Sequence, residues 1–529
     1  MTRSSYLDCA IILFVAGLVV FFNLGGIPLL DPDEPVYAQT AKEMLAHHSF
    51  ISPYIFGEFW YDKPPMYYWL VMGAAKLFGL TAFAARFPSA LLGVAGCLVM
   101  YFFVKEIFNR RTAFISALVL VTSIEYFYLA KAAVTDITLT FFLMTSLLSF
   151  LKKKYYLFYF FMGLAVVTKG PIGLFPGIIG LVYLACTRNL GELKHARFFS
   201  GMLLMFVVIL PWYASMAYLH GGDFIDTFFG FHNITRFASP EHPEKNQWYF
   251  YLPVLLIGFF PWCTLLLQSM YHSLRENGKK SSYLLFFNIW AILVFVFFSA
   301  AQTKLVSYIL PMYPAIAILV GWYINEIWDE YYVPSRPYGW IVLLIILLVA
   351  FSYGSWTGLA FFPGTENAGL FLLFDLIFLG VFSLYFLWKK QTSNAFALHI
   401  LGMIGFAFII SGMLFPLVAS QFSSSAVAQE FKEIDKDPAQ PVFITKFLRP
   451  GVAFYSDVYG TEYNPNRSIA EINDFLEKNP QAWLILRQID YDALPALTKS
   501  KLVLIKTVDN NVIVQVQDNG AEESKTEVQ

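Results

Sequence analysis

The chain has 529 residues, of which 57% are hydrophobic and only 14% charged, and its formal net charge is −1. A soluble protein carries roughly 25% charged residues, so this composition excludes an ordinary soluble chain of this length. The 55 Phe and 31 Tyr residues exclude intrinsic disorder, and the near-zero charge excludes a basic nucleic-acid-binding protein. We therefore expect a polytopic membrane protein that contacts membrane lipids and has no nucleic-acid partner.

Apolar segments that can cross a bilayer recur along the chain. A transmembrane helix needs roughly 20 apolar residues, and the sequence predicts about thirteen such helices. They lie near 7–24, 82–104, 112–130, 136–151, 155–168, 171–187, 200–219, 249–270, 282–300, 305–325, 338–360, 368–388 and 395–418. The first segment is expected to be an uncleaved anchor, because no A-x-A-like cleavage site precedes the polar stretch that follows it.

Basic residues are distributed unevenly among the predicted loops. With a cytoplasmic N-terminus, the short cytoplasmic loops contain Lys105, Arg110, Arg111, Lys152, Lys153, Lys154, Arg188, Lys194, Arg197, Arg275, Lys279, Lys280, Arg336, Lys389 and Lys390. Short cytoplasmic loops are typically rich in Lys and Arg, so this orientation is favoured. Thirteen spans then place the C-terminus in the outer compartment.

The composition changes near residue 418, where charged residues become frequent. The strand-length apolar runs beyond it lie at 441–445, 482–486, 501–506 and 511–516. Ser468 and Glu471 have the spacing of a capping box that opens a helix through about Lys478. Residues 509–511 are suited to a hairpin turn. These signals predict a small α/β domain.

The predicted domains are therefore a membrane domain at 1–418, the α/β domain at 419–517 and a disordered tail at 518–529. Within the first, residues 25–81 form an outside loop that contains surface helices.

Charged side chains gather on the predicted outer face, where charges at a membrane edge are costly and indicate function. They are Asp33, Glu34, Asp62, Lys63, Lys131, Asp136, Lys169, His232, Arg236 and Lys304. Loops on the outer side of a membrane are usually poor in Lys and Arg, so the basic residues among them need another explanation. Anion binding is the simplest one. Each residue also has a structural alternative.

These alternatives follow from local sequence. Asp33 and Glu34 suit the first turn of a helix, and Asp136 suits an N-cap. The Asp62–Lys63 pair lies in an aromatic stretch typical of an interfacial belt. Lys169 can extend to the membrane edge, and a single His residue is more often structural than a ligand.

The motifs resemble those of a known family. They are Asp33-Glu34-x-x-Tyr37, Tyr61-Asp62-Lys63-Pro64, Thr168-Lys169-Gly170, His232-x-x-x-Arg236-Phe237, Trp248-Tyr-Phe-Tyr-Leu-Pro253 and Lys304-x-x-x-Tyr308-Ile-Leu-Pro311. In this order they resemble the lipid A aminoarabinose transferases, which are related to the protein O-mannosyltransferases. The resemblance implies a membrane glycosyltransferase of the GT-C type.

The resemblance also implies an activity. Members transfer a sugar, with inversion, from an undecaprenyl-phosphate carrier at the periplasmic face of the bacterial inner membrane. The expected sugar is 4-amino-4-deoxy-L-arabinose or another amino sugar, and the expected acceptor is lipid A.

Residue roles are implied by the same matches. Asp33 and Asp136 match catalytic positions, and Asp62 and His232 match suspected ligands of a divalent metal ion. Substrate-binding roles are implied for Glu34, Tyr37, Lys63, Lys169, Arg236, Lys304 and Tyr308. Val36 stands where the family usually has Arg, and Asp62 where it usually has Glu.

Other functions remain compatible with the motifs. A related transferase would act on a protein, a lipopolysaccharide core or another envelope glycan, and Asp33 would then serve as a general base rather than orient the acceptor. A lipid or sugar transporter is the alternative of another class. Transporters typically contain repeated halves and polar sites near the membrane midplane, which this sequence does not show.

Overall fold

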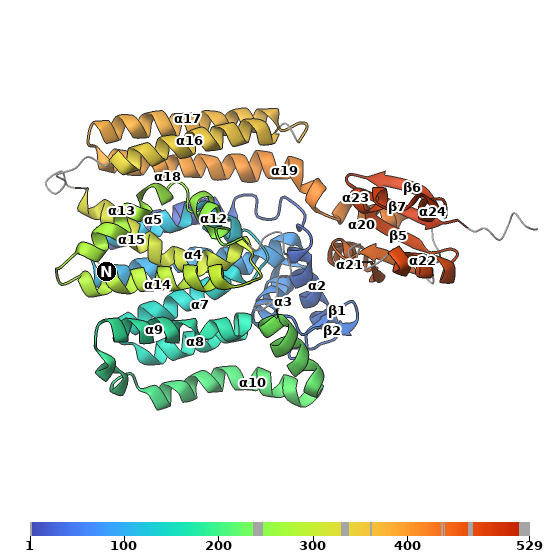
Figure 1. Ribbon diagram of the computed structural model, residues 1–529, viewed down its shortest axis with the longest axis horizontal. Helices are drawn as coiled ribbons and strands as arrows, with labels where there is room; N and C mark the ends of the chain where they lie inside the picture. Colours follow the sequence, from blue (N-terminus) through green and yellow to red (C-terminus); the bar gives the residue numbers. More distant parts are fainter. Residues whose placement is uncertain are drawn as a thin grey trace, which may run out of the picture. The chain divides into compact units, whose positions relative to one another are not determined.

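The computed structural model describes residues 3–235, 247–328, 338–359, 362–434, 437, 440–463 and 469–517. The chain divides into two compact units (Figure 1). Unit 1 comprises Met1–Leu24, Tyr61–Leu70 and Arg86–Leu414, and unit 2 comprises Gly25–Trp60, Val71–Ala85 and Phe415–Gln529. The residues 25–60 thus belong to the same unit as the C-terminal residues.

Unit 1 is helical. Its elements are α1 (Arg3–Phe21), α4 (Ala82–Ile107, from Arg86), α5 (Arg110–Val121), α6 (Ile124–Ala130), α7 (Asp136–Leu151), α8 (Tyr155–Lys169), η1 (Gly170–Leu174), α9 (Phe175–Cys186), η2 (Leu190–Lys194), α10 (Phe198–Ile225), η3 (Asp226–Thr235), α12 (Tyr251–Gly258), α13 (Cys263–Arg275), α14 (Ser281–Ala300), η5 (Val306–Met312), α15 (Tyr313–Glu326), α16 (Tyr338–Leu359), α17 (Glu366–Trp388), α18 (Thr392–Ile409) and η6 (Ile410–Leu414). Helix α7 packs against α8, α5 against α15, and α17 against both α16 and α18 (Figure 1).

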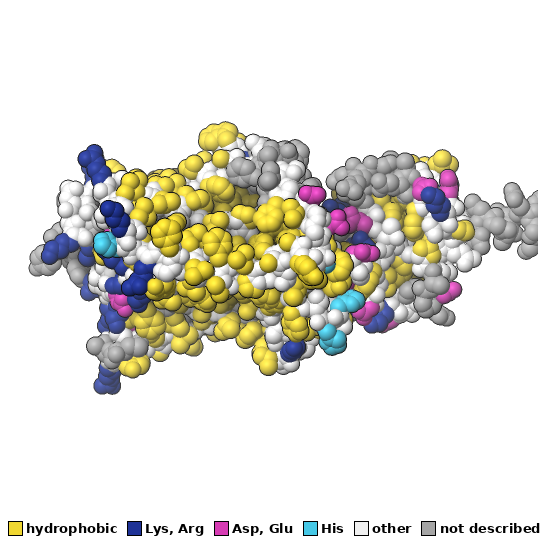
Figure 2. Space-filling model, turned by 90° about the horizontal axis from the view of Figure 1, so that it is seen from below, with side chains coloured by type: hydrophobic (Ala, Val, Ile, Leu, Met, Phe, Trp, Pro, Cys, Tyr) yellow, Lys and Arg dark blue, Asp and Glu magenta, His cyan; other side chains and the backbone are white. Residues whose placement is uncertain are grey.

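The helical unit is a membrane domain. In the described residues, nine helices are long and apolar enough to cross a bilayer, or up to eleven if the bent pairs α5–α6 and α12–α13 are each one span. On the face that Figure 2 shows, apolar side chains cover most of this unit, and Lys and Arg side chains gather at one end of it. Such an apolar surface is stable only in contact with lipid.

The run Tyr155–Cys186, one of those nine, is two antiparallel helices. The Phe150 ring lies 6.3 Å from Tyr155 at the start of α8 and 6.4 Å from Tyr183 near the end of α9. The start of one helix and the end of the other therefore lie at the same end of the unit. Gly170, with φ of 77°, begins the reversal, and the segments predicted at 155–168 and 171–187 are two separate helices.

Predicted cytoplasmic loops meet at one end of unit 1. Lys152, after α7, pairs with Glu106 near the end of α4 at 3.2 Å. Lys153 pairs with Glu192, after α9, at 2.9 Å. The Arg110 guanidinium at the start of α5 contacts the Asp8 carboxylate of α1. These loops lie together as the sequence predicts.

Unit 2 contains a five-stranded mixed sheet of order β4-β3-β5-β7-β6. The strands are β3 (Val442–Thr445), β4 (Thr461–Tyr463), β5 (Trp483–Arg487), β6 (Leu502–Val508) and β7 (Asn511–Val516). Strand β3 is parallel to β4 and β5, and β7 is antiparallel to β5 and β6. Four of these strands match the predicted runs, and the β6–β7 turn lies at Asp509 as expected.

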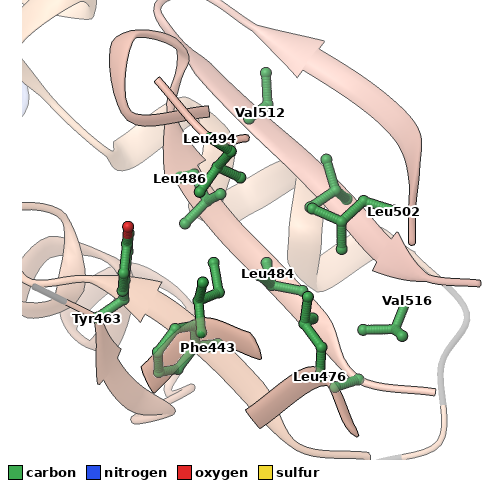
Figure 3. Packing of buried hydrophobic residues seen from close by; sticks show 12 residues of the cluster. Phe443, Tyr463, Leu476, Leu484, Leu486, Leu494, Leu502, Val512 and Val516 are labelled. Carbon is green, nitrogen blue, oxygen red and sulfur yellow. The ribbon is translucent and has the colours of Figure 1, made fainter. Parts of the chain in front are cut away.

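Helices cover both faces of this sheet. They are α20 (Ser425–Glu433), α21 (Arg449–Ser456), α22 (Ile469–Lys478), α23 (Gln488–Asp492) and α24 (Ala496–Lys499). Because side chains alternate along a strand, Phe443, Leu484 and Val514 pack with Leu476 of α22 on one face (Figure 3). Ile444 and Ile485 pack with α20 and α21 on the other. Ser468 of the capping box lies outside the described residues, and the side chain of Glu471 in α22 is not described; the helix ends at Lys478, as predicted.

The N-terminal part of unit 2 contains α2 (Asp33–Ala46) and a small hairpin of β1 (Tyr54–Ile55) and β2 (Glu58–Phe59). Glu43 of α2 accepts hydrogen bonds at 2.8 Å from the backbone N–H groups of Phe56 and Gly57. Lys42 forms a 2.6 Å ion pair with Asp457, just after α21. Helix α2 is thereby attached both to the hairpin and to the C-terminal part of its own unit.

Candidate active site

An ion pair joins two of the predicted site residues. Asp136 is the first residue of α7 and Lys169 the last of α8, and Lys169 Nζ lies 2.8 Å from Asp136 Oδ1. The Asp136 side chain is 9% exposed and the Lys169 side chain 16%. Thr135, not Asp136, is the N-cap of α7, so the capping interpretation of Asp136 is wrong.

A third predicted residue completes this group. The Lys169 ammonium lies over the Tyr308 ring, 5.0 Å from its centroid. Tyr308 belongs to η5, and its ring also contacts Phe298 of α14 at 5.4 Å. Lys169 is therefore held between a carboxylate and an aromatic face, in an arrangement that stabilises its charge.

Asp62 and Lys63 form a second pair, in which Lys63 Nζ lies 2.8 Å from Asp62 Oδ1. Their side chains are 15% and 17% exposed. The Asp62 carboxylate also interacts electrostatically with Lys169, so the two pairs belong to one charged region. The neighbouring Tyr61 and Trp69 pack against an aromatic cluster from α10 and η3, which includes Trp212 and Phe224.

Lys304 lies between α14 and η5 and is 3% exposed. Removal from solvent lowers the pKa of its ammonium below the usual range. Burying a lysine ammonium costs free energy unless the ammonium interacts with an opposite charge or a hydrogen-bond acceptor. Lys304 directly precedes the segment that contains Tyr308.

Lys131 has a structural role, contrary to the anion-binding hypothesis. Its ammonium donates to the carbonyl oxygen of Val20 at 3.2 Å and to that of Phe22. Arg86 donates to the Leu24 carbonyl at 3.1 Å. Both cations therefore bind carbonyl groups at and just beyond the C-terminal end of α1, where a helix carries partial negative charge.

Asp33, Glu34 and Tyr37 lie on α2 in unit 2. Asp33 is exposed at the first position of the helix. Glu34 is buried and its Oε2 accepts a 2.8 Å hydrogen bond from Leu30 N, which fixes the turn before the helix. The N-cap is Pro32, so Asp33 is a first-turn acidic residue rather than a cap. The substrate-binding roles of Glu34 and Tyr37 stay predictions.

The two remaining candidates cannot be placed in the same detail. Arg236 and the side chain of His232 lie outside the described residues. Within the part of the chain that the structure describes, no group of three or more His, Cys, Asp or Glu residues is arranged to hold a metal ion. Asp62, the other suspected ligand, contacts Lys63. The described residues alone therefore do not form a metal site.

Sequence reasoning missed a buried polar pair in the same unit. Glu125 of α6 is 4% exposed and accepts a hydrogen bond from the Tyr313 hydroxyl of α15. Glu125 also interacts electrostatically with Asp136. The sequence did contain a signal for Glu125, because an acidic residue within the apolar segment 112–130 is costly in a membrane and indicates a specific role.

The chain is similar to several proteins of known name or structure. Residues 62–214 match the family model described as dolichyl-phosphate-mannose-protein mannosyltransferase. A protein of Edwardsiella ictaluri named undecaprenyl phosphate-alpha-4-amino-4-deoxy-L-arabinose arabinosyl transferase is 31% identical over 395 residues, covering 71% of this chain and 70% of the relative. The protein of that name from Aeromonas hydrophila is 29% identical over 397 residues, covering 71% of each chain.

Solved structures show the same fold. The crystal structure of ArnT from Cupriavidus metallidurans bound to undecaprenyl phosphate superposes with a TM-score of 0.80 at 21% identity, covering 97% of this chain and 98% of that one. The archaeal oligosaccharyltransferase AglB from Archaeoglobus fulgidus matches with a TM-score of 0.53 at 13% identity, covering 92% of this chain and 70% of that one. The predicted fold class, a GT-C membrane protein with a small α/β region near its C-terminus, is confirmed. The chain belongs to the family of undecaprenyl phosphate-aminoarabinose arabinosyltransferases.

Proposed function

We propose that this protein transfers 4-amino-4-deoxy-L-arabinose from undecaprenyl phosphate to lipid A. The names of its relatives support the sugar and the carrier. The observation that carries the proposal is the position of Lys169, held between Asp136 and the Tyr308 ring in the same charged region as Asp62 and Lys63. Such cationic groups in a partly buried site suit a lipid-linked phosphate.

The transfer is a displacement at the anomeric carbon of the sugar. An oxygen of a lipid A phosphate forms the new bond to this carbon, and the bond to the carrier phosphate breaks with its electron pair leaving on undecaprenyl phosphate. The leaving group is an anion, so it needs charge stabilisation rather than a proton. Lys63 and Arg236 are assigned to this phosphate, Lys as a point charge and Arg through paired hydrogen bonds. A largely dehydrated site strengthens both interactions.

Asp33 is assigned to the acceptor side. A lipid A phosphate is already ionised near neutral pH, so the reaction needs no general base. Asp33 then orients the acceptor or stabilises positive charge that develops on the sugar ring. Its exposure at the start of α2 is compatible with contact to a substrate.

The site is assigned to the periplasmic face of the inner membrane. Support comes from the loops of Lys105, Lys152 and Arg188, which are rich in basic residues and short, as cytoplasmic loops are. Asp136 begins α7, whose other end leads to Lys152, and Lys169 precedes α9, whose other end leads to Arg188. Lys304 follows α14, whose other end lies next to Lys280. The N-terminus is then cytoplasmic.

A divalent metal ion held by Asp62 and His232 is also proposed, by resemblance alone. When bound it would supply positive charge near the leaving phosphate. Asp62 is positioned in this region by its contact with Lys63. Transfer in the presence of a chelator, with and without added Mg²⁺ or Mn²⁺, tests the requirement directly; undiminished turnover in the chelator would remove the metal from the account.

The proposal is tested with purified protein in detergent, undecaprenyl-phosphate-aminoarabinose and lipid A. Lys63→Ala is expected to raise the KM for the lipid-phosphate donor at least tenfold, since charge-assisted hydrogen bonds contribute about 1.5–3 kcal/mol. Lys76→Ala is the matched control, because Lys76 is an exposed lysine near the end of α3 (Met66–Phe78). Equal donor dependence in both variants would remove Lys63 from the donor site.

A further inference from the structure

The segment that contains Tyr308 is short and irregular. Tyr308 lies in η5 (Val306–Met312), a 3-10 helix with Pro311 inside it. Short 3-10 turns have weaker hydrogen bonds than α-helices and rarely hold their geometry alone. The precise placement of Tyr308 and the preceding Lys304 therefore depends on contacts from other elements.

Two buried side chains hold this segment at its two ends. The Tyr251 hydroxyl donates to the Leu305 carbonyl at 3.0 Å. Trp290 Nε1 of α14 donates to the Pro311 carbonyl at 2.9 Å. Both side chains are fully buried; the Trp290 bond is buried as well, and the Tyr251 bond is partly buried.

The Leu305 carbonyl links Tyr251 directly to Tyr308. This oxygen also accepts the backbone N–H of Tyr308 at 3.1 Å. One acceptor thus receives both the Tyr251 hydroxyl and the backbone amide of Tyr308, the residue whose ring covers Lys169. A shift of the Leu305 carbonyl would move the Tyr308 backbone with it.

Helix α12, which begins with Tyr251, is itself held at its other end. A Cβ atom on Gly258 would lie 2.6 Å from Glu125 Oε2 and would also meet the Tyr313 hydroxyl. The helix end therefore packs on the Glu125–Tyr313 pair without space for a side chain. Because α12 is fixed there, it presents the Tyr251 hydroxyl to Leu305 from a defined position.

We propose that Tyr251 is a positioning residue for the donor site, acting through the Leu305 carbonyl on Tyr308 and Lys304. This inference rests on the proposed function, in which the charged region that contains Lys169 and the Tyr308 ring binds the lipid-linked phosphate. Tyr251 does not touch substrate in this account. Its hydroxyl sets the position of the groups that do.

The test compares Tyr251→Phe with Tyr249→Phe in the full-length protein. Tyr249 lies two residues earlier, is 45% exposed, and its hydroxyl forms no hydrogen bond among the described residues. Tyr251→Phe keeps the buried ring and removes one neutral hydrogen bond, so the KM for undecaprenyl-phosphate-aminoarabinose is expected to rise about 3- to 10-fold. The KM for lipid A is expected to stay unchanged in both variants, and Tyr249→Phe to match the parent for the donor.

A double-mutant cycle separates positioning from general loosening. If Tyr251 acts through Tyr308, then Tyr251→Phe has a smaller effect on donor KM in a Tyr308→Phe background than in the parent. Three results would overturn the inference. The first is that the two substitutions have additive effects on donor KM. The others are an equal rise in KM for both substrates and a donor KM of Tyr251→Phe equal to that of Tyr249→Phe.

Failure of the proposed function is recognised separately. If Lys63→Ala and Tyr308→Phe both bind donor as the parent does, the donor site is misassigned and the positioning role falls with it. If these two variants lose donor affinity and Tyr251→Phe does not, only the positioning role is wrong.

Discussion

Lys169 at the end of α8 lies with its ammonium 2.8 Å from Asp136 Oδ1 at the start of α7. The two residues are far apart in sequence, and the α7–α8 hairpin brings them to the same end of the helical unit. The Tyr308 ring covers the ammonium from a third element. This contact therefore ties three segments of the chain together at the proposed donor site.

Breaking this ion pair on one side is expected to destabilise the protein. Asp136→Asn leaves the Lys169 ammonium without its carboxylate, and Lys169→Met leaves the carboxylate without its cation; each costs about 3–5 kcal/mol when the remaining charge is buried. Thermal unfolding in detergent measures the loss. The Asp136→Asn/Lys169→Met double variant is expected to be more stable than the sum of the two single losses predicts, and strict additivity would show that the two charges do not interact.

Gly258→Ala is expected to destabilise unit 1 by about 1–3 kcal/mol, because the new methyl group overpacks a filled site. The atoms it meets are the Tyr313 hydroxyl and the Glu125 carboxylate. Gly354→Ala in α16 is the control, because nothing lies within 4 Å of a Cβ placed there. Comparison of the two melting temperatures tests the packing of α12, and equal values would contradict it.

The stability of unit 2 is expected to depend on pH through Asp31. Burial raises the pKa of this carboxyl to about 8, although Ser424 N donates to its Oδ2 at 2.5 Å. In the unfolded chain the pKa is about 3.9, so between these two values the native state retains a proton that the unfolded state releases. The free energy of unfolding therefore falls as the pH rises from about 4 to about 8 and then levels off.

The measurement is the rate of hydrogen exchange at the backbone amides of β5 and β7, corrected for the intrinsic pH dependence of exchange. The protection of these amides is expected to fall as the pH rises from about 4 to about 8. Asp31→Asn, which resembles the protonated side chain, is expected to flatten it. An unchanged slope in this variant would assign the pH dependence to another group.

Asp33→Asn is expected to reduce transfer by roughly 100-fold or more, in the range typical of a lost group that stabilises charge in the transition state. The protein should remain folded, because Asp33 is exposed at the start of α2. Glu58→Gln, at an exposed acid in β2 of the same unit, is the control. Turnover of Asp33→Asn close to that of the control would exclude Asp33 from the mechanism.

The sequence predicted the positions of the apolar helices, because hydrophobic length is a local property, but thirteen spans were expected and nine, or up to eleven, of the described helices are long and apolar enough to cross a bilayer. Each predicted span has a helical counterpart in the described residues, including the reversal at Gly170. The strands near residues 442, 483, 502 and 511 were also found. Strand β4 has only three residues, Thr461–Tyr463, too few for a pattern to stand out.

The candidate site was predicted in part, and its contacts were not. Asp136, Lys169 and Asp62 were recognised as charges at a membrane edge, yet Lys131 has the same signal and binds helix-end carbonyls instead. Only the tertiary structure distinguishes the two cases. The bond from Tyr251 to the Leu305 carbonyl joins distant segments through a backbone atom, so no residue pattern encodes it.

Mass spectrometry of lipid A from cells with and without the gene tests the central claim most directly. The account predicts that lipid A from cells with the gene carries aminoarabinose on a phosphate, and that deletion removes this mass. Complementation with the parent gene restores it and complementation with Asp33→Asn does not. Lipid A of identical mass in both strains, under conditions where the protein and its donor are present, would contradict the proposed acceptor.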